Sequence, residues 1–139
     1  MDPIDQRQAD LQPLTSDELI ERRVASLVGR AQGRQVWLLF LHPDDVQSPL
    51  IMPVSGAPLV PDAADLGDWT RVIGEASEAV GASAVIVVLE RYASDRLTEA
   101  DRAWARFTVD GCRDADVELR AVVLSHRRGV SLVDPAEYA

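Results

Sequence analysis

The sequence predicts an α/β domain in which one mixed sheet of about five strands carries helices on its faces. Short runs that are apolar at every position alternate along the chain with longer segments whose apolar residues recur every three or four positions. The chain has 139 residues, of which 47% are hydrophobic, and this size fits one compact domain with its own core. The predicted order of elements is α-β-β-α-β-α-β-β.

The first predicted helix lies within "LTSDELIERRVASLVGRAQG", residues 14–33. Thr15 and Glu18 have the spacing of a capping box, in which each side chain bonds a free backbone N–H at the helix start. Gly33 is the expected end of this helix. Residues 1–13 contain two prolines and no periodicity, so we expect a flexible tail there. The apolar stripe of the helix consists of Leu19, Ile20, Val24, Leu27, Val28 and Ala31.

Two strands are predicted next, and they form a hairpin. Residues 36–41 are apolar throughout, as in a strand that is covered on both faces. Turn-forming residues follow at 43–45. The second strand, "PLIMPVS" at 49–55, contains Pro49 and Pro53, which cannot donate ladder hydrogen bonds. It is therefore expected at a sheet edge or with a bulge.

The middle of the chain predicts a loop, a helix and the clearest buried strand. The loop covers residues 55–67, and the helix runs roughly from 64 to 80, where Gly81 stops it. "SAVIVVLE", residues 83–90, is rich in branched side chains that suit a sheet. The helix face expected in the core consists of Trp69, Val72, Ile73, Ala76 and Val80.

The last third of the chain predicts a helix over 98–113 and two strands, at 117–125 and 130–134, joined by a tight turn. With no internal repeat, residues 14–135 form one domain, and residues 136–139 are a short tail. The helix face expected in the core consists of Ala100, Ala103, Trp104, Phe107 and Gly111.

Composition favours an acidic, cytoplasmic, bacterial protein. The net charge is −9, which repels a phosphate backbone and disfavours nucleic-acid binding. All 14 basic residues are arginine, a bias typical of GC-rich bacterial coding. Cys112 is the only cysteine, so no internal disulfide can form, which fits a reducing compartment. The N-terminus lacks the pattern of a signal peptide and the apolar runs are too short to cross a membrane.

The sequence contains few side chains of the kind that metal sites and nucleophilic enzymes use. His42, His126 and Cys112 lack the close spacing of a zinc site, and no H-E-x-x-H, P-loop, G-x-S-x-G or G-x-G-x-x-G motif is present. We interpret both histidines as surface turn residues and Cys112 as a structural thiol. Arg127 and Arg128 could bind an anion, although exposed arginines are more often solvated. We therefore predict no catalytic residue, metal or cofactor.

The most site-like segment is "VVLERYASDRLTEAD", residues 87–101, where a buried strand leads into a helix. Ligand sites of α/β proteins often lie at such junctions. Mixed charges and a tyrosine there could form a polar pocket. The alternative is that Thr98 and Asp101 only cap the helix. The candidate ligand-binding residues are Glu90, Arg91, Tyr92, Asp95, Arg96 and Asp101.

The segments "ASAVIVVLE", "RYASDRL", "TEAD", "VELRAVVLS" and "GVSLVD" resemble, in this order, the JAB/JAMM (MPN) domain in its RadC-type bacterial branch. The resemblance covers about residues 71–135, and the element order is similar to the broader cytidine-deaminase-like architecture. Thr98 and Asp101 stand where the family has a serine and a metal-binding aspartate. Its two histidines are missing from "VLERYAS", and the deaminase cysteine motif is absent. The resemblance thus implies a metal-free pseudoenzyme without peptidase activity.

Two functional hypotheses follow. The first is a non-catalytic interaction or regulatory module, which contacts a second copy or a protein partner through the strand edge near Pro49–Val54. The alternative is a small-ligand-binding domain or metal-independent enzyme with its site at residues 90–96. A nucleic-acid role by analogy with the RadC-type branch ranks last, because the chain is acidic and lacks a basic stripe.

Overall fold

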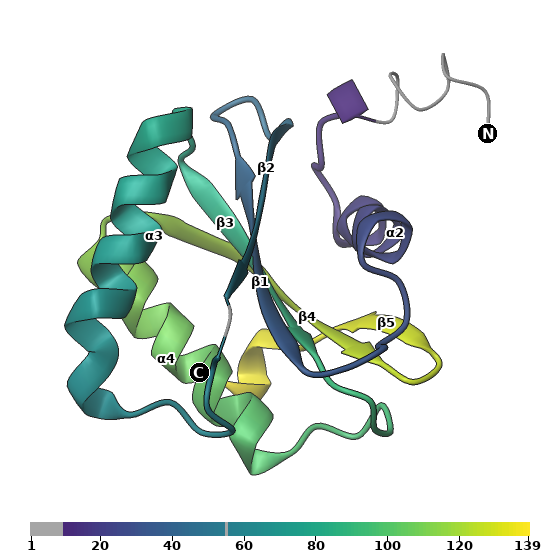
Figure 1. Cartoon of the computed structure of the whole chain (residues 1–139). Helices are drawn as coiled ribbons and strands as arrows, with labels where there is room; N and C mark the ends of the chain where they lie inside the picture. Colours follow the sequence, from purple (N-terminus) through teal and green to yellow (C-terminus); the bar gives the residue numbers. More distant parts are fainter. Residues whose placement is uncertain (1–9, 55) are drawn as a thin grey trace.

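A computed structural model describes residues 10–54 and 56–139 (Figure 1). The fold class is α/β, as predicted, with α-helices of 11 to 16 residues and one five-stranded mixed sheet in the predicted order. Most of the predicted N-terminal tail, residues 1–9, lies outside the described residues. None of the helices in the described part is long and apolar enough to span a membrane.

The strand order across the sheet is β2-β1-β3-β4-β5. β3 and β4 are parallel, and the remaining neighbours are antiparallel. The β1–β2 and β4–β5 hairpins therefore flank one central parallel pair. The strand bounds are β1 Gln35–Leu41, β2 Gln47–Val54, β3 Ala84–Glu90, β4 Glu118–His126 and β5 Gly129–Leu132.

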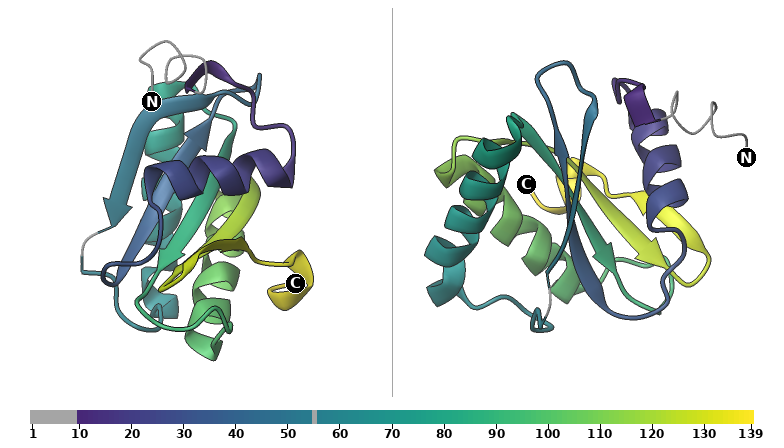
Figure 2. Two further views of the ribbon diagram at one scale, coloured as in Figure 1. Left: turned by 90° about the vertical axis from the view of Figure 1, so that its right-hand side faces the viewer. Right: turned by 45° about the horizontal axis from the view of Figure 1, so that its top comes forward.

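The helices cover the two faces of the sheet unequally (Figures 1 and 2). α3 (Leu66–Val80) and α4 (Glu99–Asp114) pack side by side on one face, whereas in the described part of the chain α2 (Asp17–Leu27) is the helix that packs on the other face. β3 is buried on both faces because each of its alternating side chains meets one of these layers. Three aromatic rings, those of Trp69, Trp104 and Phe107, pack between α3 and α4.

α2 is shorter than predicted. Its N-cap is Ser16 and not Thr15, because the Ser16 hydroxyl accepts the Leu19 N–H at 3.2 Å. It ends at Leu27, and Gly29 then adopts a left-handed φ of 70°, so the chain turns before it reaches the predicted stop at Gly33. The sequence offers two adjacent capping residues and two glycines, and packing selects between them.

α3 begins after a 3-10 turn, Ala63–Asp65, and ends at Gly81, whose φ of 69° confirms the predicted stop. Its buried stripe differs from the predicted one. Val72 is 37% exposed, and Ser77 is buried in its place. The contact with α4 follows every fourth position, so Ser77 shares a line with the two buried residues Trp69 and Ile73.

α4 has the predicted start, since Thr98 and Asp101 form a capping box. The predicted core positions Trp104 and Gly111 are buried, but Ala100, Ala103 and Phe107 are only partly so. The inward stripe of the helix is therefore displaced from the predicted one, and it includes Asp101, whose carboxylate binds Arg91 and Thr98. The buried residues of α4 are Asp101, Trp104, Ala105, Thr108, Gly111 and Cys112.

β2 lies at a sheet edge and is irregular, as its prolines predicted. Leu39 pairs with Ile51 and Leu41 with Gln47, so four positions of β2 span two of β1. Pro53 occupies a regular position opposite Trp37. A proline is tolerated there because its nitrogen faces the open edge and not the neighbouring strand.

Candidate functional site

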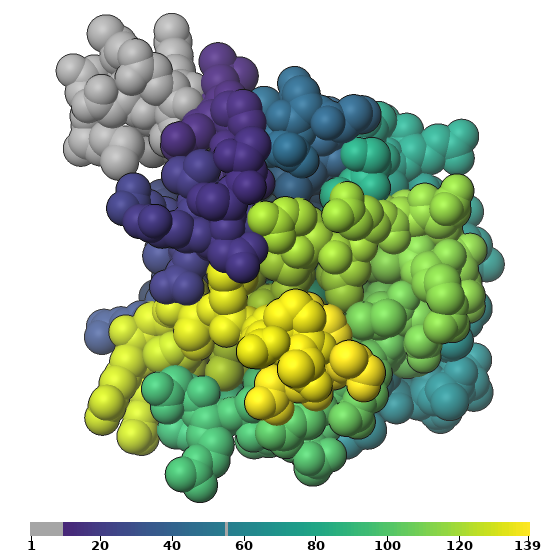
Figure 3. Space-filling view, turned by 180° about the vertical axis from the view of Figure 1, so that it is seen from behind, coloured from purple at the N-terminus to yellow at the C-terminus, as the bar shows by residue number. Residues whose placement is uncertain are grey.

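The predicted site lies where three loops meet at the carboxyl ends of β3 and β4. These are the α2–β1 loop (28–34), the β3–α4 loop (91–98) and the β4–β5 turn (127–128). Figure 3 shows the C-terminal end of the chain, in yellow, beside the green segment that includes α4. Four hydrogen bonds join the loops and strands: Ala31 N–H to the His126 carbonyl (2.8 Å), Arg127 N–H to the Ala93 carbonyl (3.0 Å), Arg91 N–H to the Ser125 carbonyl (3.0 Å), and the Ser125 hydroxyl to the Gly29 carbonyl (2.7 Å).

Glu90, at the end of β3, anchors the α2–β1 loop to the sheet. One carboxylate oxygen accepts the Trp37 indole N–H at 2.9 Å. The other oxygen accepts the backbone N–H groups of Gln32 (2.9 Å) and Gly33 (3.3 Å). The carboxylate therefore satisfies three donors of the fold, a structural role that the sequence pattern did not predict.

Arg91 and Asp101 form an ion pair that organises the β3–α4 loop. The Arg91 Nε lies 2.9 Å from both Asp101 oxygens, and Nη2 lies 2.8 Å from Oδ2. The same guanidinium donates to the carbonyls of Ser94 (2.8 Å) and Arg96 (2.7 Å). The two side chains are only 15% and 7% exposed, so this is a buried pair whose charges satisfy one another.

Asp101 also caps α4, which confirms the capping interpretation of the sequence. Its Oδ2 accepts the Thr98 N–H at 2.8 Å, and its own N–H donates to the Thr98 hydroxyl at 3.2 Å. Burial by itself would raise the pKa of Asp101, but the hydrogen bonds from Arg91 and Thr98 outweigh it. The pKa is therefore lowered from its ordinary 3.8, and the carboxylate is ionised in the folded protein.

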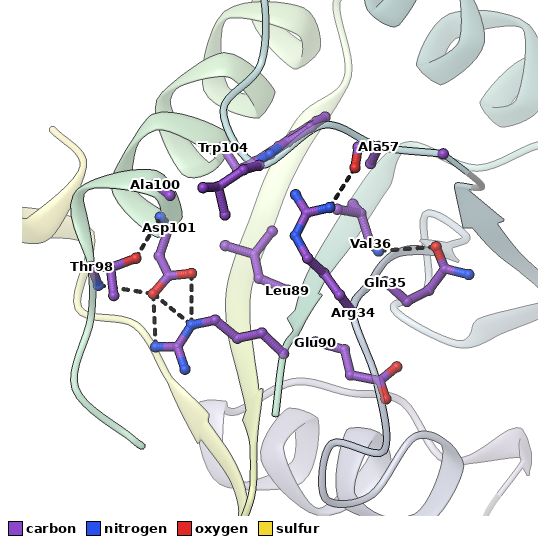
Figure 4. A pocket seen from close by; sticks show the side chains of 13 residues that line it. Arg34, Gln35, Val36, Ala57, Leu89, Glu90, Thr98, Ala100, Asp101 and Trp104 are labelled. Carbon is purple, nitrogen blue, oxygen red and sulfur yellow. Dashed lines mark hydrogen bonds and ion pairs between the residues drawn. The ribbon is translucent and has the colours of Figure 1, made fainter. Parts of the chain in front are cut away.

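These residues border an inner cavity of about 160 Å³, shown in Figure 4. Arg34 reaches across it to donate to the carbonyls of Ala57 and Pro58, and the Trp104 indole also donates to Pro58, at 3.0 Å. In Figure 4 the Glu90 carboxylate points away from that of Asp101. The four ionised side chains that line the cavity thus each bond within the fold: Arg34, Glu90, Arg91 and Asp101.

Tyr92, Asp95 and Arg96 lie on the solvent side of the β3–α4 loop, apart from the inner cavity. Tyr92 is 71% exposed and borders a second, open hollow of about 330 Å³. We call this the arginine hollow; it is lined by Arg30, Ala31, Gln32, Tyr92 and Arg127. The structure therefore divides the predicted site residues between two places, and brings only Tyr92 to the hollow.

Arg30 and Arg127 are the residues of the hollow that sequence reasoning missed or set aside. Arg127 was recognised as a potential anion ligand and interpreted as solvated surface. Arg30 had no signal of its own, because only the folded chain brings the α2–β1 loop beside Tyr92. Within residues 10–54 and 56–139, neither arginine forms an ion pair.

The interpretation of His126 as a surface turn residue was wrong. It is the last residue of β4 and only 7% exposed, and its Nδ1 lies 3.3 Å from the Arg128 backbone nitrogen. His42 is half-buried, with Nδ1 3.3 Å from the Gly81 carbonyl oxygen. Each ring thus has its Nδ1 beside a backbone group of the fold.

Cys112 is a buried thiol, as predicted, and burial raises its pKa to about 12. It therefore stays protonated and is a poor nucleophile at neutral pH. Among the described residues, no three side chains of histidine, cysteine, aspartate or glutamate come together as a metal site would require.

No model of a known protein family matches this sequence, and no curated protein is significantly similar to it. Asp101, for which the sequence resemblance implies the place of a metal-binding aspartate, here binds Arg91 and Thr98.

Proposed function

We propose that this chain is a non-catalytic binding module of the cytoplasm that recognises its ligand at the arginine hollow. The observation that supports the proposal is the contrast between two sets of charged side chains at one end of the sheet. Those of the inner cavity bond within the fold, whereas Arg30 and Arg127 face the hollow without an ion pair among the described residues. Arginine and tyrosine side chains are enriched at the surfaces through which proteins bind their partners.

In this proposal Glu90, Arg91 and Asp101 do not contact the ligand. They hold the loops that form the hollow in place. Glu90 holds the α2–β1 loop that carries Arg30, and Arg91 holds the β3–α4 loop that carries Tyr92. Backbone hydrogen bonds join both loops to β4 and its turn. The hollow is therefore formed before any ligand arrives, which reduces the entropy lost on binding.

A thermal-shift screen over metabolites and short peptides tests this proposal, since a ligand that binds only the folded state raises its melting temperature. A ligand of the hollow should stabilise the wild type but not the Arg127→Ala or Tyr92→Ala variants. Arg106→Ala is the matched control, because Arg106 is an exposed arginine of α4 outside the hollow. If no compound distinguishes the wild type from these variants, binding at the hollow is disproved.

The open edge of β2 supports a second proposal, that two copies of the chain associate through Pro49–Val54. The segment "PLIMP" reads almost the same in both directions around Ile51. In an antiparallel pair centred on Ile51, each Leu50 faces Met52 of the other copy, and Pro49 faces Pro53. The prolines donate no ladder hydrogen bonds, so this association depends mainly on apolar side-chain contact. Apolar side chains, half-buried in one copy, would then meet across the two-fold axis.

Size-exclusion chromatography with light scattering tests this second proposal. We expect twice the monomer mass for the wild type and the monomer mass for Ile51→Asp. Val72→Asp is the control, because Val72 is an exposed apolar residue of α3, away from β2. A wild type that stays monomeric at high concentration contradicts association through β2, and leaves the hollow unaffected.

A further inference from the structure

The arginines of this chain are not distributed evenly between paired and unpaired states. Seven form ion pairs with carboxylates: Arg22, Arg23, Arg71, Arg91, Arg102, Arg113 and Arg120. Arg34 instead donates to two carbonyls. The other arginines in the described part of the chain form no ion pair: Arg30, Arg96, Arg106, Arg127 and Arg128.

All of these unpaired arginines except Arg106 lie on the three loops that meet at the hollow. Within these three loops the one acidic residue is Asp95, and Glu90 ends β3 directly before the β3–α4 loop. The Glu90 carboxylate accepts hydrogen bonds from three N–H donors of the fold, and Asp95 is a single exposed charge. A local surplus of positive charge therefore exists at this end of a molecule whose net charge is −9.

The residues of the hollow match a ligand that has an anionic group and a flat ring. Two guanidinium groups, Arg30 and Arg127, approach from different loops, and each can donate two parallel hydrogen bonds to phosphoryl oxygens. The exposed ring of Tyr92 offers a surface on which a planar ring can stack. The Gln32 side chain adds an amide for polar contacts at the same rim.

The charge of the whole chain favours a small ligand over a polyanion. A nucleic acid would extend beyond the loops and meet the acidic surface, where its phosphates are repelled. A ligand that fits a hollow of about 330 Å³ meets mainly the local field of the arginines.

We propose that the arginine hollow binds a phosphate-bearing small molecule with a planar ring, of which a nucleotide is the simplest example. This assignment rests on the binding function proposed above and adds the chemical class of the ligand. Arg30 and Arg127 hold the phosphate, and Tyr92 stacks on the ring. Phosphate binding is electrostatic, so the affinity falls as salt concentration rises.

Isothermal titration calorimetry with ATP, pyrophosphate and adenosine tests the assignment. Arg30→Ala and Arg127→Ala should each weaken ATP and pyrophosphate binding about ten-fold or more. Tyr92→Ala should weaken ATP binding about five-fold or more but leave pyrophosphate unchanged, since only ATP has a ring to stack. Arg106→Ala should bind every probe as the wild type does.

Three results would overturn the assignment, and they differ from failure of the binding function itself. Adenosine binding as tightly as ATP would show that the arginines do not hold a phosphate. A single-stranded oligonucleotide that binds more tightly than ATP would show that the ligand is a polymer. The thermal-shift screen could also yield a phosphate-free compound whose binding requires Arg127, while neither ATP nor pyrophosphate binds at millimolar concentration. That result would support the binding function but contradict the assignment of a phosphate-bearing ligand.

Discussion

Individual charged residues at the end of β3 differ in role although the sequence places them within a few positions of each other. Arg91 is buried against Asp101, whereas Tyr92, the next residue, is largely exposed. The residue types predicted a polar site, and the capping spacing of Thr98 and Asp101 was readable from the sequence. Which charges were already paired was not readable, because the partners of Glu90 and the neighbours of Tyr92 come from the α2–β1 loop.

Removal of the Asp101 charge should be costly. The Asp101→Asn variant leaves Arg91 buried without its counter-ion, and we expect a loss of about 3 kcal/mol in the free energy of unfolding by urea denaturation. Asp110→Asn is the matched control. Asp110 pairs with Arg113 where both side chains are well exposed, so its loss should stay below about 1 kcal/mol. Equal effects of the two substitutions would contradict a special role for the buried pair.

The same pair predicts a pH dependence. The folded pKa of Asp101 lies below its ordinary 3.8, so the folded state favours the ionised form. Its contribution to stability is therefore complete well above pH 3.8 and is lost as the pH falls below that value through the folded pKa. The difference in unfolding free energy between wild type and Asp101→Asn should accordingly shrink at acidic pH. A constant difference down to pH 2, well below the ordinary pKa, would show that the charge does not stabilise the fold.

Cys112 should be unreactive in the native state. Its pKa of about 12 and its burial within α4 leave almost no thiolate at neutral pH and no access for a reagent. We expect a thiol reagent such as DTNB to modify it only slowly in buffer and rapidly in denaturant. Fast modification of the folded protein would show that α4 opens locally far more often than its packing suggests.

At the scale of elements, the types and order of the helices and strands followed from periodicity, whereas their inward faces did not. Strands such as β3 were unambiguous because every position from Ala84 to Leu89 is apolar. The buried faces of α3 and α4 differ by one or two positions from the faces that periodicity predicted. Their orientation depends on how the two helices cross, and that crossing is controlled by a small residue, Gly111. No periodicity within one helix contains this information.

Two helical glycines test the crossing. A Cβ at Gly111 would lie 2.9 Å from Trp69 Cδ1 and 3.2 Å from Ile73 Cδ1, closer than packed carbons normally approach. We expect Gly111→Ala to destabilise the protein by about 1–3 kcal/mol despite alanine's better helix propensity. At Gly74 a Cβ would meet Ala115 Cβ at an ordinary 3.6 Å, so Gly74→Ala should be neutral or stabilising by up to about 1 kcal/mol. The melting temperature should fall for Gly111→Ala and should stay the same or rise for Gly74→Ala. A Gly111→Ala variant that is as stable as Gly74→Ala would contradict the close contact.

On the scale of the whole molecule, the two faces of the sheet depend on different numbers of helices. Two helices share one face, and α2 covers the other in the part of the chain that the structure describes. The amphipathic stripe of α2 was evident in the sequence, but its position as the sole helix of a layer was not. That position follows from sheet topology, which places both crossover helices on the opposite face.

The stability of the second face should therefore depend strongly on the two fully buried side chains of α2, Ile20 and Val24. Ile20→Ala creates a cavity against the sheet, and we expect a loss of about 2–4 kcal/mol in the free energy of unfolding. The control is Val72→Ala on the exposed side of α3, which should cost less than about 1 kcal/mol. Among the described residues α2 is the helix that covers this face. The double variant Ile20→Ala, Val24→Ala should therefore expose the apolar sheet face and bind the dye ANS while retaining strand signal in circular dichroism. A double variant that unfolds in one cooperative step without dye binding would contradict this expectation. It would show that α2 and the sheet unfold together as one cooperative unit.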